Sequence, residues 1–371
     1  MDPSLNPALL SRSEAQRPLP TTAFAPSSEL VIEVPCDTVI KRMRIRFSGN
    51  IVTTFASGTP VADQFSTVSN LVTNVRLVID GATTLKSVSP YFQQQMQLLT
   101  STVLAERKSS AAASAAAFNN PVADAGFTYG STTNVTTVAE SFDLFFEVPF
   151  ARKEDKYATL LNLKGRSTCE LKFVTGAYAN LLGFGNTAPV VFSAASFNLD
   201  VVLIEDRSIP REQVFLDYVQ SNQTYQYSSQ ASGVREKLPV SQFLMAISLL
   251  TRDGAAGSST TASGRVANSN VIGNVQLQLN GMTTIKNTTF AQLQSENRAR
   301  YGVQAPFASS VSRLDGYAHM DFLQDGMLDT AVDCRRSQGI DNVELVFDLQ
   351  AVSYTNPVTL QLETHEYRVR S

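Results

Sequence analysis

The sequence contains an internal repeat, and this feature restricts the fold more than any other. Residues 70–86 read NLVTNVRLVIDGATTLK and residues 270–286 read NVIGNVQLQLNGMTTIK, identical at eight of 17 positions. In each copy an alternating strand runs into Asp80-Gly81 or Asn280-Gly281, a dipeptide that favours a two-residue hairpin turn. A repeat at a separation of 200 residues in a chain of 371 predicts two successive units of one plan.

The rest of each unit is predicted to be mainly β-structure. Short runs rich in Val, Leu, Phe and Thr, bounded by turn residues, predict strands at 30–34, 39–47, 72–79, 141–148, 169–174, 197–204, 243–250, 271–279, 343–349 and 358–362. Only 91–108 and 290–300 have helical composition, and each follows the repeated hairpin. Many short strands with turn residues between them are typical of a β-sandwich or barrel.

Proline content and the repeat together suggest a division of the chain. Residues 1–27 hold Pro3, Pro7, Pro18, Pro20 and Pro26 without periodicity, which predicts an extended arm. The two units are then expected at 28–207 and 223–371. A linker over 208–222 would join them, with Pro210 as a breaker.

Composition excludes several classes of protein. The chain is 43% hydrophobic and can bury a core, and its net charge of −3 does not indicate general attraction to nucleic acid. Cys36, Cys169 and Cys334 are odd in number and far apart, which predicts buried free thiols. The first residues resemble no secretory signal, and no stretch of about 18 apolar residues predicts a membrane span.

Catalytic and metal-binding patterns are weak. His319 and His365, the two histidines of the chain, fall in the segments 319–324 and 359–368, which the repeat aligns with strand segments 142–147 and 198–207. We therefore expect partly buried or interface side chains rather than a catalytic base. Asp321, Asp325, Asp329 and Asp333 repeat every four residues, but Gly326 interrupts them. We expect solvated or inter-subunit carboxylates there, with a weak calcium site as the alternative. No cofactor and no catalytic residue is predicted.

One charged pattern could carry a function. Arg42, Arg44 and Arg46 alternate with apolar residues in the predicted strand at 39–47, so the three guanidinium groups share one face. Like charges at this spacing repel, so the face needs water, carboxylates or phosphate. The alternatives are a solvated, salt-bridged sheet face, or contact with a neighbouring subunit, a lipid headgroup or nucleic acid.

Two successive β-sandwiches with a helix after the same hairpin, long polar loops and a proline-rich arm resemble the double jelly-roll major capsid proteins of the tectivirus and adenovirus lineage. The segment FFEVPF at 145–150, followed by a polar loop and ELKF at 170–173, carries the resemblance most clearly. The resemblance implies an all-β fold of two tandem eight-stranded jelly rolls, each with a short inserted helix. It also implies three chains in a pseudo-hexagonal capsomer.

The function implied by this resemblance is that of the major coat protein of a tailless icosahedral bacteriophage, located in the virion shell and assembled in the host cytoplasm. Its partners would be further copies of itself, penton or minor capsid proteins, and an internal membrane or the genome on the inner face. A carbohydrate- or receptor-binding virion module is the alternative, although the chain has no Trp for an aromatic platform. A two-domain glycosidase is a third hypothesis, for which no carboxylate pair stands out.

Overall fold

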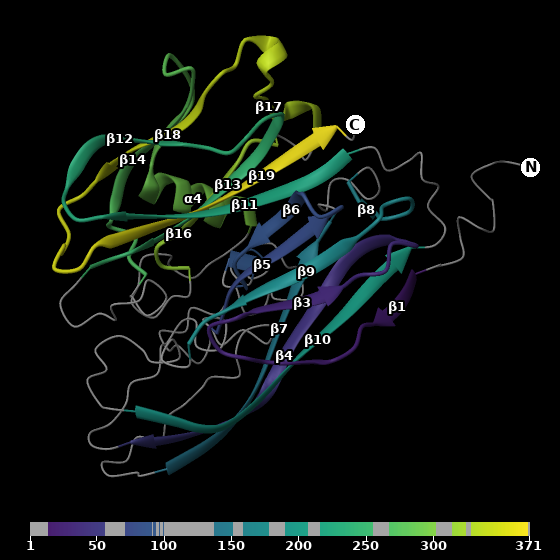
Figure 1. Ribbon diagram of the computed structural model, residues 1–371. Helices are drawn as coiled ribbons and strands as arrows, with labels where there is room; N and C mark the ends of the chain where they lie inside the picture. Colours follow the sequence, from purple (N-terminus) through teal and green to yellow (C-terminus); the bar gives the residue numbers. More distant parts are fainter. Residues whose placement is uncertain are drawn as a thin grey trace, which may run out of the picture.

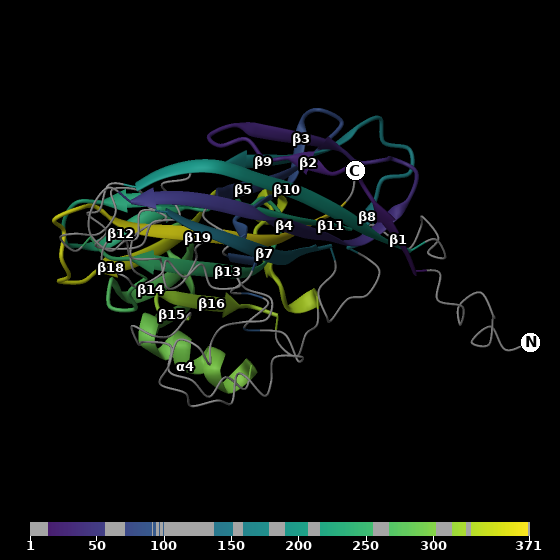
Figure 2. The ribbon, with the colours of Figure 1, turned by 90° about the horizontal axis from the view of Figure 1, so that it is seen from below.

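The fold consists of two β-sandwiches that share one long sheet, as shown by a computed structural model (Figures 1 and 2). The structure describes residues 14–55, 71–90, 92, 93, 96, 99, 137–150, 159–177, 190–206, 216–254, 267–301, 314–323 and 328–369. Among these residues, no helix is long and apolar enough to cross a membrane.

The first sandwich pairs a sheet of order β1-β10-β4-β7, here called sheet I, with the strands β3-β9-β5-β6. Sheet I comprises β1 (Glu14–Pro18), β10 (Val190–Asp206), β4 (Val39–Phe55) and β7 (Thr137–Pro149), with β2 (Thr22–Ala23) and β8 (Leu161–Asn162) at its margins. The opposing strands are β3 (Glu29–Glu33), β9 (Cys169–Thr175), β5 (Val72–Ile79) and β6 (Thr83–Val88).

The second sandwich repeats this plan. Its strands β11-β19-β13-β16 oppose a sheet of order β12-β18-β14-β15, here called sheet III. The first set comprises β11 (Leu216–Tyr227), β19 (Val358–Val369), β13 (Phe243–Arg252) and β16 (Tyr317–Asp321), with β17 (Val332–Asp333) beside β13. Sheet III comprises β12 (Ala231–Lys237), β18 (Val343–Leu349), β14 (Ile272–Leu279) and β15 (Thr283–Thr289).

Both sandwiches are jelly rolls. When the principal strands of each are numbered along the chain, the sheet orders are 1-8-3-6 and 2-7-4-5 in both copies. This is the strand exchange of an eight-stranded jelly roll made from two Greek keys. The predicted fold class, an all-β chain of two tandem jelly rolls, is confirmed.

The helix expected in the second copy is also confirmed. It is α4 (Phe290–Tyr301), and the short 3-10 helices η8 (Leu328–Thr330) and η9 (Arg336–Gln338) follow later in that copy. In the first copy Phe92, Gln93, Met96 and Leu99 have helical backbone, and the remainder of the predicted helix lies outside the described residues.

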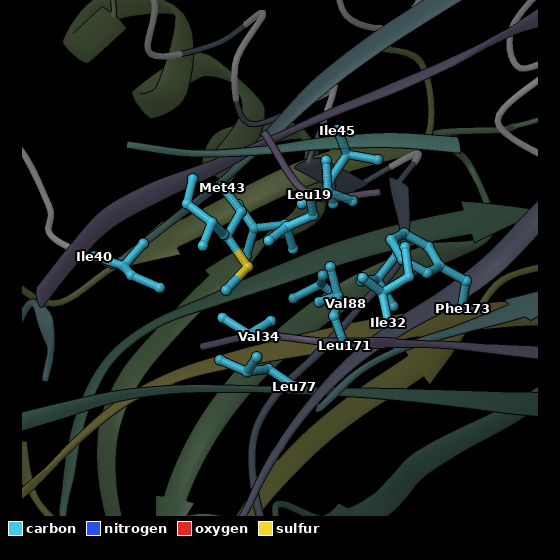
Figure 3. Close-up of a cluster of buried hydrophobic side chains, with 14 of the residues drawn as sticks. Leu19, Ile32, Val34, Ile40, Met43, Ile45, Leu77, Val88, Leu171 and Phe173 are labelled. Atoms are coloured by element: carbon cyan, nitrogen blue, oxygen red, sulfur yellow. The ribbon is translucent and has the colours of Figure 1, made fainter. Parts of the chain in front are cut away.

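Each sandwich has its own apolar core. In the first, Met43 and Ile45 of sheet I point toward Leu77, Leu171 and Phe173 of the opposing strands (Figure 3). A second core lies between sheet III and the strands β13, β16 and β19. Alternation of apolar and polar residues places one face of each strand in these cores.

The two hairpins of the repeat have the backbone that their sequence predicts. Asp80 and Gly81 have φ of 52° and 71°, and Asn280 and Gly281 have φ of 52° and 67°. Two successive positive φ values are those of a type I′ turn, which matches the twist of the flanking strands.

The predicted division of the chain stays a prediction, but two segments that it places outside the sandwiches carry strands. Glu14–Pro18 pairs with β10 although it lies in the expected arm, and β11 begins at Leu216 inside the expected linker. Pro18 is tolerated because β1 is an edge strand of sheet I.

Candidate functional site

The three arginines of β4 share the outer face of sheet I. Their neighbours Met43, Ile45 and Phe47 are fully buried in the first core, so Arg42, Arg44 and Arg46 point away from it. The exposed fractions of these arginine side chains are 37%, 32% and 52%. The predicted common face therefore exists and reaches the surface of the single chain.

Carboxylates from the adjacent strands offset part of the positive charge of this face. The Nε of Arg44 donates to Oε1 of Glu147 at 2.8 Å, and the Nε of Arg42 lies 3.5 Å from the same oxygen. On the other side, Arg46 lies 3.9 Å from Asp200. The face is a mixed, salt-bridged surface, which suits recognition of a mixed protein surface better than attraction of a polyanion.

A second polar site is buried where the two sandwiches meet. Strand β6 of the first sandwich pairs in parallel with β11 of the second at Lys86 and Gln220, which makes a continuous nine-stranded sheet. The Lys86 side chain is completely buried; its Nζ donates to Oε1 of Gln220 at 2.6 Å and lies 3.4 Å from the ring centroid of Tyr218. A hydrogen bond and an aromatic face thus replace its lost hydration.

The carboxyl group with the largest electrostatic influence on this lysine belongs to Glu363. Its Oε1 accepts hydrogen bonds from the side-chain amides of Gln220 at 2.9 Å and Gln93 at 3.1 Å. Burial raises the pKa of Glu363 to about 8, and burial lowers the pKa of Lys86 well below its usual value. The low polarity of the joint therefore favours the neutral form of both groups.

The two histidines lie on the same buried surface, on β16 and β19, with Ser248 of β13 between them. Ser248 Oγ lies 3.0 Å from Nδ1 of His319 and 3.2 Å from Nε2 of His365. The hydroxyl of Tyr218 lies 2.7 Å from Nδ1 of His365. The expectation that these strand histidines are buried is met, and the structure adds that they are neighbours.

This grouping lacks the geometry of a serine hydrolase. Glu363 Oε1 lies 3.5 Å from Nε2 of His365, the same nitrogen that contacts Ser248, whereas a triad needs the carboxylate on the other nitrogen. Ser248, His319, His365 and Glu363 are each at most 1% exposed. A substrate has no access to them, so the arrangement joins elements of structure.

The described members of the acidic series do not form a cluster. Asp321 on β16 lies 3.2 Å from Arg300, and Asp333 on β17 lies 2.7 Å from Arg335. Asp329 is on η8, and Asp325 lies outside the described residues. Hydrogen bonds from Arg335 lower the pKa of Asp333. Within the described ranges, no group of three or more His, Cys, Asp or Glu residues could hold a metal ion.

The cysteines are free in the structure. Cys169 and Cys334 are buried and Cys36 is half-buried. Burial raises the pKa of both Cys169 and Cys334 to about 12, so their thiols remain protonated and unreactive.

The polar joint could be found only partly from sequence. Lys86 and Lys286 are identical in the repeat, but Lys286 is partly exposed, so the identity marks a shared position without predicting a buried lysine. The partners of Lys86 come from residues 93, 220 and 363, whose convergence depends on the order of strands in the long sheet.

Comparison with known proteins agrees with the topology. No family model and no curated protein matches the sequence. Among solved structures, the major capsid protein of STIV, the Sulfolobus turreted icosahedral virus, has 16% identity and a TM-score of 0.63, over 96% of this chain and 97% of that chain. The major capsid protein P2 of bacteriophage PM2 has 14% identity and a TM-score of 0.53, over 96% and 98%.

A capsid structure of the virus PBCV-1 is similar as well, with 10% identity and a TM-score of 0.54 over 96% of this chain and 94% of that chain. The matches span both sandwiches, so they concern the way the two are joined as well as each sandwich alone. Together with the strand orders described above, they show that this chain has the double jelly-roll fold of these viral major capsid proteins.

Proposed function

We propose that the protein is the major coat protein of an icosahedral virus and that three chains form a pseudo-hexagonal capsomer. The observation that carries this proposal is the joint between the sandwiches. One nine-stranded sheet holds two jelly rolls side by side, so each chain supplies two similar blocks in a fixed relation. Fold likeness over 96% of this chain to the major capsid protein of STIV supports the same conclusion.

The physical advantage of such a chain is that its copies can tile a closed surface as a lattice. Three copies present six similar blocks, and a block with hexagonal outline fills a surface without gaps. A contact between unlike surfaces closes into a ring when the rotation between copies allows it. A shell protein needs this repeated contact between two unlike, mutually complementary surfaces rather than a pocket for a small molecule.

A structural role also fits the polar groups. The cluster around Lys86 and Glu363 is closed to solvent, and two carboxylates, Glu147 and Asp200, neutralise part of the charge of the three arginines. We therefore propose a protein that is not an enzyme and acts in the virion shell. Its partners would be other capsomers, penton or minor capsid proteins, and a membrane or the genome on the inner side.

The experiment is a measurement of solution mass by light scattering on the purified chain. Three 40.3-kDa chains give about 121 kDa, and we expect this mass over a wide range of concentration. Electron micrographs of concentrated samples should then show hexagonal particles. A chain that stays at 40.3 kDa when concentrated would contradict the proposal. That result would favour the carbohydrate- or receptor-binding module, which a glycan array would test.

A further inference from the structure

The joint inside the chain has two parts. At the sheet edge, β6 of the first sandwich pairs with β11 of the second through Lys86 and Gln220. Beyond it, the helical residues after β6 lie on the outer face of β13 and β19: Gln93 donates to Glu363, and the sulfur of Met96 lies 3.7 Å from Ser248 Oγ. The strand and the helix that follows it thus act together as one docking unit.

The repeat supplies a second copy of this docking unit. By the offset of 200 residues, β15 corresponds to β6, Lys286 to Lys86, and α4 to the segment that contains the helical residues Phe92, Gln93, Met96 and Leu99. In Figure 2, α4 lies at the margin of the molecule beyond β16, far from β1 and sheet I. Strand β15 is an edge strand of sheet III.

Equivalent positions of the two units differ in exposure. Leu85 is 4% exposed and its counterpart Ile285 is 40% exposed. Lys86 is completely buried, whereas the side chain of Lys286 is 26% exposed. In the first copy Gln220 and Tyr218 of the second sandwich cover Lys86. In the second copy β15 is an edge strand, and within the described part of the chain no other sheet pairs with it.

The repeat also supplies a second copy of the receiving surface. Strand β1 occupies in the first jelly roll the place that β11 occupies in the second. Gln16 lies opposite Ile204 and Gln220 lies opposite His365, at matching positions of β10 and β19. Gln16 therefore corresponds to Gln220, but Gln220 is 1% exposed and Gln16 is exposed.

The arginine face belongs to this receiving surface. In the first jelly roll, Arg44 lies opposite Val202 of β10. In the second, Ser248 lies opposite Glu363, the equivalent position of β19. Arg44 therefore corresponds to Ser248. Ser248 contacts Met96, and Met96 corresponds to Glu296 of α4. Glu296 is 43% exposed and lies 2.5 Å from Lys286 in its own chain. The equivalent contact between two chains would therefore bring a carboxylate to an arginine.

We propose that β15 and α4 of one copy dock on β1 and the arginine face of a second copy, and repeat between chains the joint that exists within each chain. In this contact Lys286 meets Gln16, and Glu296 meets Arg44. The two surfaces are unlike and lie on different sides of the molecule, so three such contacts close a ring of six jelly rolls when each turns the next copy by one third of a circle. The inference rests on the proposed function and identifies the surfaces that the capsomer uses.

A disulfide tests the pairing of the strands. Lys86 and Gln220 are direct partners in the parallel pair within the chain, a spacing that a disulfide can bridge. We expect the double variant Gln16→Cys/Lys286→Cys, oxidised under mild conditions, to give covalent dimers and trimers on a denaturing gel. Each single variant is the matched control and should stay monomeric on that gel. This control also shows that Cys36, Cys169 and Cys334 do not form the cross-link with the introduced cysteine.

Charge substitution tests the helix contact. We expect Glu296→Arg to lower the solution mass from about 121 kDa to 40.3 kDa at a concentration where the unaltered chain is trimeric. An unchanged circular dichroism spectrum would show that the variant is folded. Arg44→Glu/Glu296→Arg should restore the trimer in part, because the new carboxylate at position 44 also faces Glu147 of its own chain.

The outcomes separate this inference from the proposed function. A chain that is trimeric by light scattering but gives no cross-link in the double cysteine variant, and keeps its mass in Glu296→Arg, would overturn the pairing and leave the coat-protein proposal standing. A chain that is never trimeric would overturn both. Loss of vesicle or nucleic-acid binding in Arg44→Glu, with the trimer intact, would assign the arginine face to those ligands instead.

Discussion

At the scale of single residues, Glu363 makes stability depend on pH. Its pKa is raised from 4.5 to about 8 because the carboxyl group is completely buried. Between these pH values the folded chain keeps this proton and the unfolded chain does not, so the unfolded state binds fewer protons. The free energy of unfolding contributed by this group therefore decreases as pH rises from about 4.5 to 8.

We expect Glu363→Gln to remove this part of the pH dependence, since an amide of similar shape does not titrate. Denaturant unfolding of both chains at several pH values between 5 and 8 measures it. The difference between the two chains reports the titration of Glu363 together with its effect on Lys86, because the Glu363 charge raises the pKa of Lys86 and the Gln variant removes that influence. If the free energy of unfolding changed with pH in the same way for both chains, Glu363 would be charged in the folded state.

At the scale of elements, the stability of the two hairpins depends on the positive φ of their turn residues. A Cβ atom at Gly81 would meet no heavy atom within 4 Å, and a Cβ atom at Gly281 only the ends of Arg235 and Glu344, at 3.7 and 3.9 Å. Space is therefore available, and the cost of a β-branched residue comes from the positive φ. We expect Gly81→Val or Gly281→Val to reduce the free energy of unfolding by about 1 to 3 kcal/mol.

The matched variants Gly81→Asn and Gly281→Asn should lose clearly less, because Asn tolerates positive φ better than Val does. Thermal or denaturant unfolding measures both pairs. Equal losses for Val and Asn would assign the effect to the change of side chain rather than to the turn.

The strands that could be predicted are those whose own sequence carries alternation. The ranges 72–79 and 343–349 agree with β5 and β18, residue for residue. Strands β1 and β12 were missed, because EAQRP and ASGVREK contain few apolar residues, and each becomes a strand through its pairing with β10 or β18. The arginine face could be predicted from alternation alone, but its partner Glu147 lies 103 residues from Arg44 and follows from strand order.

At the scale of the whole molecule, the joint makes the two jelly rolls depend on each other. Val219 lies on β11, a strand of the second sandwich, yet its side chain belongs to the core of the first. The fully buried pair of Lys86 and Gln220 crosses the same joint. Neither sandwich can unfold without exposing apolar and polar groups of the other, and such groups are costly to expose or to leave without partners.

We therefore expect calorimetry of the unaltered chain to show one unfolding transition, and the variant Lys86→Ala/Val219→Ala to show two, because the coupling is lost while both cores remain. Val275→Ala is the matched control: Val275 is fully buried in the second core and takes no part in the joint. It should lower the melting temperature and keep a single transition at the same chain concentration. Two transitions in the unaltered chain would mean that the long sheet connects the jelly rolls without coupling their stability.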